Sequence, residues 1–125
     1  MRLNSLTIAF LLSLTSVAGA GDVSGRGPNG GKVADAPNMH VEFVSKGVEV
    51  DVYTYDHNNK PVSSSGMTGR VTVQESGKTR TADLAAAEPN RLTGKLDAPL
   101  GGGARVIVSL TPKGGKPFQA RYTAN

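Results

Sequence analysis

Residues 39–56 read MHVEFVSKGVEVDVYTYD, and apolar side chains alternate with polar ones on both sides of Lys46-Gly47. Such alternation is typical of β-strands with one buried face, and a short Gly-containing link between two of them favours a hairpin. A turn at Lys46-Gly47 pairs Phe43 with Val50, and the neighbouring pairs follow from it. We therefore predict an antiparallel hairpin over this stretch.

This register divides the side chains of the hairpin between two faces, because successive side chains of a strand point to opposite sides. The expected core face comprises Met39, Val41, Phe43, Val48, Val50 and Val52. The expected outer face comprises His40, Glu42, Val44, Glu49, Asp51, Tyr53 and Tyr55. The apolar face needs a second layer to cover it.

Two further hairpins sort their residues in the same way. A Gly77-Lys78 turn sets Glu75 opposite Arg80, Val73 opposite Ala82 and Val71 opposite Leu84. A Lys113-Gly114-Gly115 loop sets Leu110 opposite Phe118, Val108 opposite Ala120 and Val106 opposite Tyr122. With short strands near residues 32–34 and 91–96, we predict an all-β fold, an antiparallel β-sandwich of seven or eight strands.

The first twenty residues predict export. Arg2 provides a positive start, residues 3–17 carry the apolar runs, and Ala18-Gly19-Ala20 has the small residues of a cleavage site. We expect a secretory signal peptide at 1–20, a flexible Gly-rich arm at 21–31 and one β-sandwich domain at 32–125, located in the periplasm or secreted. The apolar stretch is interrupted by polar residues and is too short for a membrane span. We therefore expect no membrane insertion after signal cleavage.

Composition excludes several classes of function. Without Arg2, the chain has 13 cationic and 10 anionic side chains, a net charge of +3 that forms no basic run, and we therefore expect no nucleic-acid partner. Cysteine is absent, which excludes disulfides, thiolate metal sites and a cysteine nucleophile. No serine lies in a G-x-S-x-G elbow, and we interpret the chain as non-enzymatic.

Metal-ligating side chains gather on the polar face of the first hairpin. In the predicted register Glu42 and Asp51 are directly opposite, with Cβ atoms about 5 Å apart, and like charges so placed are destabilising without a cation. His40 lies about 7 Å along the same face. Imidazole and carboxylate together suit a copper or zinc ion, and His57 joins this set if its loop bends back over the outer face.

A second interpretation of the same residues involves no ion. The outer face is then a solvated sheet surface whose acids are neutralised by Arg70, Arg121 or another cation from a neighbouring strand. In this interpretation His57 is an ordinary residue of a polar loop.

The runs GPNGGKV at 27–33, HVEFV at 40–44, VEVDVYTYD at 48–56 and KPV at 60–62 resemble small exported bacterial β-sandwich proteins. They are also similar to segments associated with the periplasmic adaptor subunits of heavy-metal efflux systems. The resemblance implies a role near metal handling, with His40 and Glu42 as the matched positions. A His commonly precedes the Gly pair in that pattern, whereas this chain has Asn29.

Two functions of different classes follow. The first is a periplasmic metal-binding or heavy-metal-efflux accessory protein that holds a transition-metal ion weakly through His40, Glu42, Asp51 and His57 and serves a metal-efflux component. The second is a non-catalytic structural or interaction module that docks onto an envelope protein without metal.

Overall fold

The computed structural model describes residues 25–125, and the predicted signal peptide lies outside them. Eight antiparallel strands make up the described part, without a helix: β1 (Lys32–Ala36), β2 (Met39–Lys46), β3 (Glu49–Tyr55), β4 (Thr68–Glu75), β5 (Lys78–Ala87), β6 (Arg91–Lys95), β7 (Arg105–Thr111) and β8 (Phe118–Thr123). In these residues nothing meets the length and apolarity of a membrane-spanning helix.

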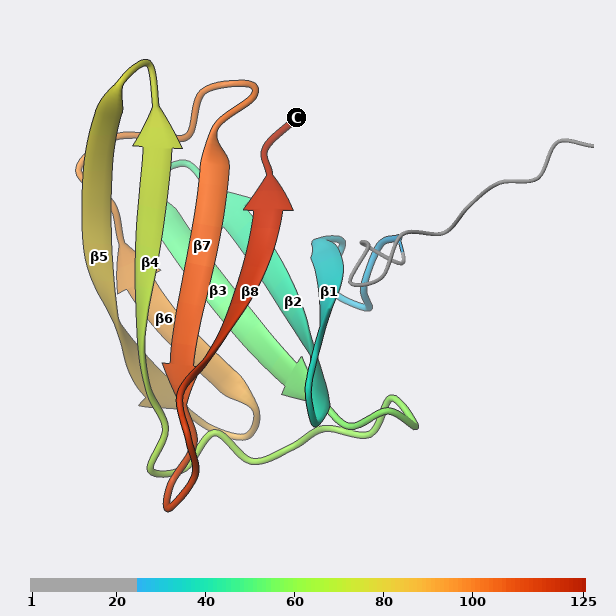
Figure 1. Cartoon of the computed structure of the whole chain (residues 1–125). Coiled ribbons are helices and arrows are strands. Elements are labelled where there is room, and N and C mark those ends of the chain that lie inside the picture. Colours follow the sequence, from blue (N-terminus) through green and yellow to red (C-terminus); the bar gives the residue numbers. More distant parts are fainter. Residues whose placement is uncertain (1–24) are drawn as a thin grey trace, which may run out of the picture.

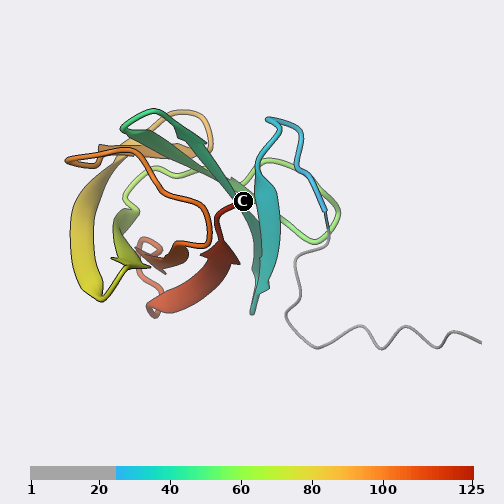
Figure 2. The same cartoon turned by 90° about the horizontal axis from the view of Figure 1, so that it is seen from above.

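The strands form one sheet in the order β1-β2-β3-β6-β5-β4-β7-β8. This sheet curls until β1 lies beside β8, so that the strands surround a shared interior (Figures 1 and 2). The all-β antiparallel prediction is confirmed, but the two separate sheets of a sandwich are not seen. The reason is that β3 pairs with β6 and β4 pairs with β7, which links the hairpins edge to edge into a nearly closed barrel.

The core consists of the inward face of every strand. Val41, Val50, Val52, Val71, Val73, Leu92, Val108 and Leu110 are fully buried there. Residues of the β1–β2–β3 wall contact those of the β7–β8 wall, as the tilted ring stacking of Phe43 on Tyr122 shows. Alternation thus puts one apolar face of each strand inside the barrel.

Side chains join β8 to β1 and β2, where the curled sheet meets itself. The Tyr122 hydroxyl donates to the Val41 carbonyl at 2.6 Å, and Lys32 Nζ donates to the Thr123 carbonyl and to Asn125 Oδ1. Burial, followed by the charge of Glu42, raises the pKa of Tyr122 well above its usual value. This phenol therefore stays protonated and keeps its donor on the Val41 carbonyl.

Two of the three predicted hairpin registers are wrong by two residues. The link between β2 and β3 is Gly47-Val48, which pairs Phe43 with Val52, and the link between β4 and β5 is Ser76-Gly77. Gly47 has φ 59° at the first central position, as a type II′ turn requires. Ser76 and Gly77 both have positive φ, as a type I′ turn requires.

A shift of two residues leaves each side chain on its predicted face, because the faces alternate with period two. The predicted core residues of these hairpins are accordingly buried, except Val48, which lies in the turn and is half-buried. The third hairpin has the predicted pairs, Leu110 with Phe118 and Val106 with Tyr122 among them.

Candidate metal-binding site

Asp35, His40 and His57 come together from three separate segments. Asp35 on β1 is paired in register with His40 on β2, and His57 follows the end of β3. One ligand atom from each residue lies within 4.8 Å of the other two. We call these three residues the histidine cluster. Figure 1 shows why they meet: the β1–β2 turn and the end of β3 lie at the same end of the barrel.

His40 is the centre of the histidine cluster. Its Nε2 lies 2.8 Å from Asp35 Oδ1, and its ring meets the ring of His57 edge to face, with centroids 4.9 Å apart. The His40 side chain is 21% exposed and that of Asp35 is 53% exposed. The cluster is thus open to solvent on the outer side of the sheet.

The loop after β3 bends back because Asp56 binds it. Its Oδ1 accepts hydrogen bonds from the backbone N–H groups of Asn58 and Lys60, at 2.8 and 2.9 Å. The Asp56 N–H also donates to the Lys60 carbonyl. The hydrogen bond from Lys60 is the largest cause that lowers the pKa of Asp56 below its usual value. Such an Asx-turn closes the loop tightly and brings His57 to His40.

Two imidazoles and one carboxylate make a ligand set for a borderline metal ion. Zinc accepts His nitrogen and Asp oxygen at about 2.0–2.2 Å, and copper(II) binds the same groups. Three protein ligands leave a coordination position open, as in zinc sites that exchange a water molecule or a substrate.

Glu42 lies on the predicted face but is fully buried beneath the loop of residues 27–31. Its Oε2 accepts from the backbone N–H groups of Asn29 and Gly31, at 2.9 and 2.8 Å, and its Oε1 accepts from Asn29 Nδ2 at 3.0 Å. A methyl group at Gly27 would overlap the carboxylate, so this position requires glycine. The carboxylate of Glu42 is therefore used by the chain's own loop.

The departure from the His-Gly-Gly pattern has a structural role here. Asn29 Nδ2 also donates to the Tyr55 hydroxyl at 3.0 Å, so the asparagine links Glu42 to β3. Among the described residues, this segment is hydrogen-bonded to the sheet already at Gly25, whose carbonyl accepts from the Val33 N–H. We expected the chain to join the sheet only near Lys32.

Asp51 does not face Glu42, so that part of the sequence prediction is wrong. Asp51 is paired with Val44 and Thr93, whereas Glu42 is paired with Tyr53. The cations expected to neutralise these acids are engaged elsewhere. Arg70 pairs with Asp83 at 3.2 Å, and Arg121 donates to Gln119.

The structure brings His40 and His57 together and adds Asp35, which the sequence reasoning missed. A strand extended from residue 34 to 36, followed by a two-residue link at Pro37-Asn38, would have placed Asp35 opposite His40. The signal was therefore present in the spacing between Asp35 and His40 across the Pro37-Asn38 turn.

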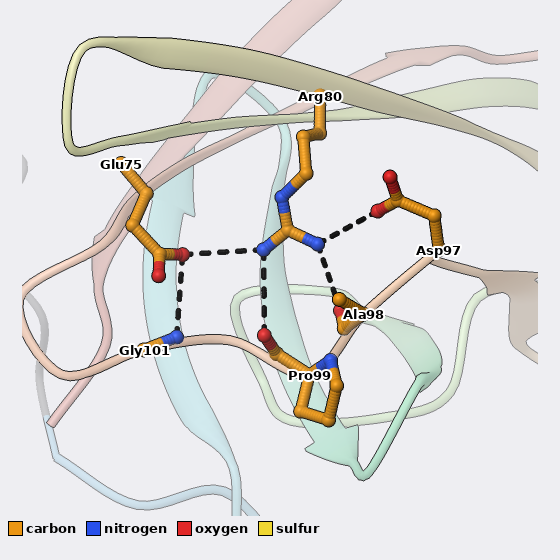
Figure 3. Close-up of polar contacts among 6 residues, drawn as sticks. All are labelled: Glu75, Arg80, Asp97, Ala98, Pro99 and Gly101. Atoms are coloured by element: carbon orange, nitrogen blue, oxygen red, sulfur yellow. Dashed lines mark hydrogen bonds and ion pairs between the residues drawn. The ribbon is translucent and has the colours of Figure 1, made fainter.

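A second charged group lies at the tip of the β4–β5 hairpin, and we call it the arginine network (Figure 3). Arg80 donates to Glu75 at 3.2 Å, to Asp97 at 2.8 Å and to the carbonyls of Ala98 and Pro99. Glu75 in turn accepts from the Gly101 N–H. The network fastens the hairpin to the chain between β6 and β7.

No family model and no curated protein matches the chain. Among solved structures, it is similar to one described as the crystal structure of a Br derivative of BhCBM56, a carbohydrate-binding module. The match has a TM-score of 0.45 and 13% identity, and covers 74% of this chain and 97% of that one. The function of the chain is therefore inferred from its own side chains.

Proposed function

We propose that this chain is an exported, non-catalytic metal-binding protein that holds one copper or zinc ion on the histidine cluster. The observation that carries the proposal is the convergence of Asp35, His40 and His57 from β1, β2 and the loop after β3. The export part rests on the signal-like sequence of residues 1–20.

A surface ion pair alone does not account for the histidine cluster. Asp35 and His40 suffice for the pair at 2.8 Å, and a pair this exposed contributes little to stability. His57 adds a second imidazole, and the hydrogen-bonded loop of Asp56 holds it against His40. Two imidazole nitrogens beside a carboxylate are what a borderline ion needs.

Openness of the site favours exchange of the ion over permanent storage. Structural zinc sites surround the metal with four protein ligands, whereas this cluster offers three and is exposed. A partner protein can approach the free coordination position and take the ion. We therefore propose a role as an accessory protein in metal handling or efflux at the cell envelope.

Calorimetric titration of the purified protein with Cu²⁺ and Zn²⁺ at neutral pH tests this function. We expect one ion per chain for the wild type and no binding heat for His40→Ala. Absence of binding for both metals in the wild type would overturn the proposal. It would favour the alternative of an interaction module, for which a partner recovered from envelope extracts is the appropriate test.

A further inference from the structure

Asn59 contacts the histidine cluster without belonging to it. Its Oδ1 lies 3.3 Å from Nδ1 of His40, on the side of the ring opposite the Nε2 that faces Asp35. An amide oxygen only accepts a hydrogen bond, so this contact is a hydrogen bond when Nδ1 carries a proton. In the metal-free protein Nε2 faces the Asp35 carboxylate, which also only accepts, so Nε2 donates there. When an ion replaces that proton at Nε2, the neutral ring keeps its proton on Nδ1, where Asn59 accepts it.

The loop conformation supports a specific role for this side chain. Asn59 has φ 62°, in the left-handed region, where asparagine is among the few tolerated residues other than glycine. Its N–H donates to the Asp56 carbonyl at 2.9 Å, which fixes the residue within the same turn that carries His57. One five-residue loop thus supplies both a metal ligand and a group that contacts the other imidazole.

We propose that Asn59 is a positioning residue: in the metal-bound protein it accepts the Nδ1–H of His40 and so keeps Nε2 directed toward Asp35 and the ion. This inference rests on the proposed metal-binding function. Metal-bound imidazoles in proteins generally donate their second N–H to an oxygen, and loss of that oxygen typically costs 10–100-fold in affinity. Asn59 supplies such an oxygen here.

The test compares Asn59→Gly, Asn59→Asp and a matched control, Asn58→Gly. Glycine adopts φ 62° without strain, so Asn59→Gly removes the amide while keeping the turn. Asn59→Asp retains an acceptor oxygen at the same place. Asn58 is exposed and uses its backbone N–H, so Asn58→Gly changes the same loop without touching His40.

Zinc affinity by calorimetry and imidazole ¹H–¹⁵N correlation spectra at pH 8 are the two measurements. We expect Asn59→Gly to lower zinc affinity by roughly 10–100-fold and to let zinc bind at Nδ1 as well as at Nε2 of His40. With zinc, the wild type, Asn59→Asp and Asn58→Gly should all show a protonated Nδ1 and a metal-bound Nε2.

Two results would overturn the inference: a zinc complex of Asn59→Gly with wild-type affinity and a protonated Nδ1, or zinc bound to Nδ1 of His40 in the wild type. If the wild type bound no zinc, the proposed function would fail separately. The metal-free spectra would then still show, through a changed Nδ1 resonance of His40 in Asn59→Gly, whether Asn59 contacts this ring.

Discussion

The histidine cluster and the arginine network are both groups of charged side chains on this barrel, yet they are satisfied to different degrees. Arg80 directs its guanidinium at two carboxylates and two carbonyls, and Glu75 has a further partner in the Gly101 N–H (Figure 3). In the histidine cluster, by contrast, one ion pair and one amide contact serve His40, and ligand atoms of three residues lie within 4.8 Å of one another.

This difference separates a structural role from a binding role. Opposite charges that complete one another's hydrogen bonds leave nothing for a further ligand to do. Two imidazoles and a carboxylate all present lone pairs when the imidazoles are neutral, so an ion can bind where they meet. Substitutions in structural groups such as the arginine network should therefore change the stability of the protein. Substitutions in the histidine cluster should change its metal affinity.

The largest effect on stability is expected at Glu42, whose carboxylate has a structural role because its hydrogen bonds are completed by the chain's own loop. Glu42→Gln replaces one acceptor oxygen by a donor within the fully buried loop contact. Hydrogen bonds to a charged group are worth about 1.5–3 kcal/mol, so we expect the free energy of unfolding to fall by about 2 kcal/mol. Zinc affinity should stay at its wild-type value.

Denaturant unfolding and zinc calorimetry on the same variant check this prediction. Glu49→Gln is the control, since Glu49 is exposed on the same hairpin, and it should change stability by less than about 0.5 kcal/mol. Loss of zinc binding in Glu42→Gln with unchanged stability would instead make Glu42 a ligand.

Asp35 and Asp51 can be compared directly, because both are aspartates on the same side of the sheet. Asp35→Asn removes a charged ligand oxygen and should weaken zinc binding by roughly tenfold, or about 1.4 kcal/mol. Asp51→Asn should leave affinity unchanged, because Asp51 lies beside Val44 and Thr93 in the sheet. Equal losses in the two variants would show that zinc is held by general negative charge on this face.

The smallest effect is expected from the arginine network at acid pH. The hydrogen bond from Arg80 is the largest cause that lowers the pKa of Asp97 below its usual value. A carboxyl with a lowered folded-state pKa stabilises the fold above its unfolded-state pKa of about 3.9, and this contribution disappears as pH falls through the folded-state value.

Asp97→Asn should therefore flatten the acid limb of the stability curve, below about pH 4, and change little at pH 7 beyond the loss of one exposed ion pair. Urea unfolding across pH 2–7 measures this. An acid limb identical to that of the wild type would show that the Arg80–Asp97 contact at 2.8 Å does not persist in solution.

The sequence predicted which face of each strand is buried better than it predicted which residues pair. Alternation alone determines the face, and a register error of two residues leaves it unchanged. Pairing depends on which central turn position the glycine occupies. Gly47 takes the first position and Gly77 the second, a distinction that residue type did not reveal.

Only part of the candidate metal-binding site was predicted, because alternation does not reveal contacts made by loops. His40 and His57 were named from residue type, and Asp56 explains why the loop of His57 closes. Glu42 was assigned to the wrong role because its partners, Asn29 and Gly31, lie in a Gly-rich segment without periodicity. Asp35 was missed because β1 was expected to end two residues too early.

Anomalous diffraction at the zinc edge, from crystals grown with Zn²⁺, tests the central claim most directly. We predict a peak about 2.0–2.2 Å from Nε2 of His40, a nitrogen of His57 and a carboxylate oxygen of Asp35. A peak beside Glu42 or Asp51 would contradict the claim. So would the absence of a peak at the histidine cluster when its side chains are well resolved in the density.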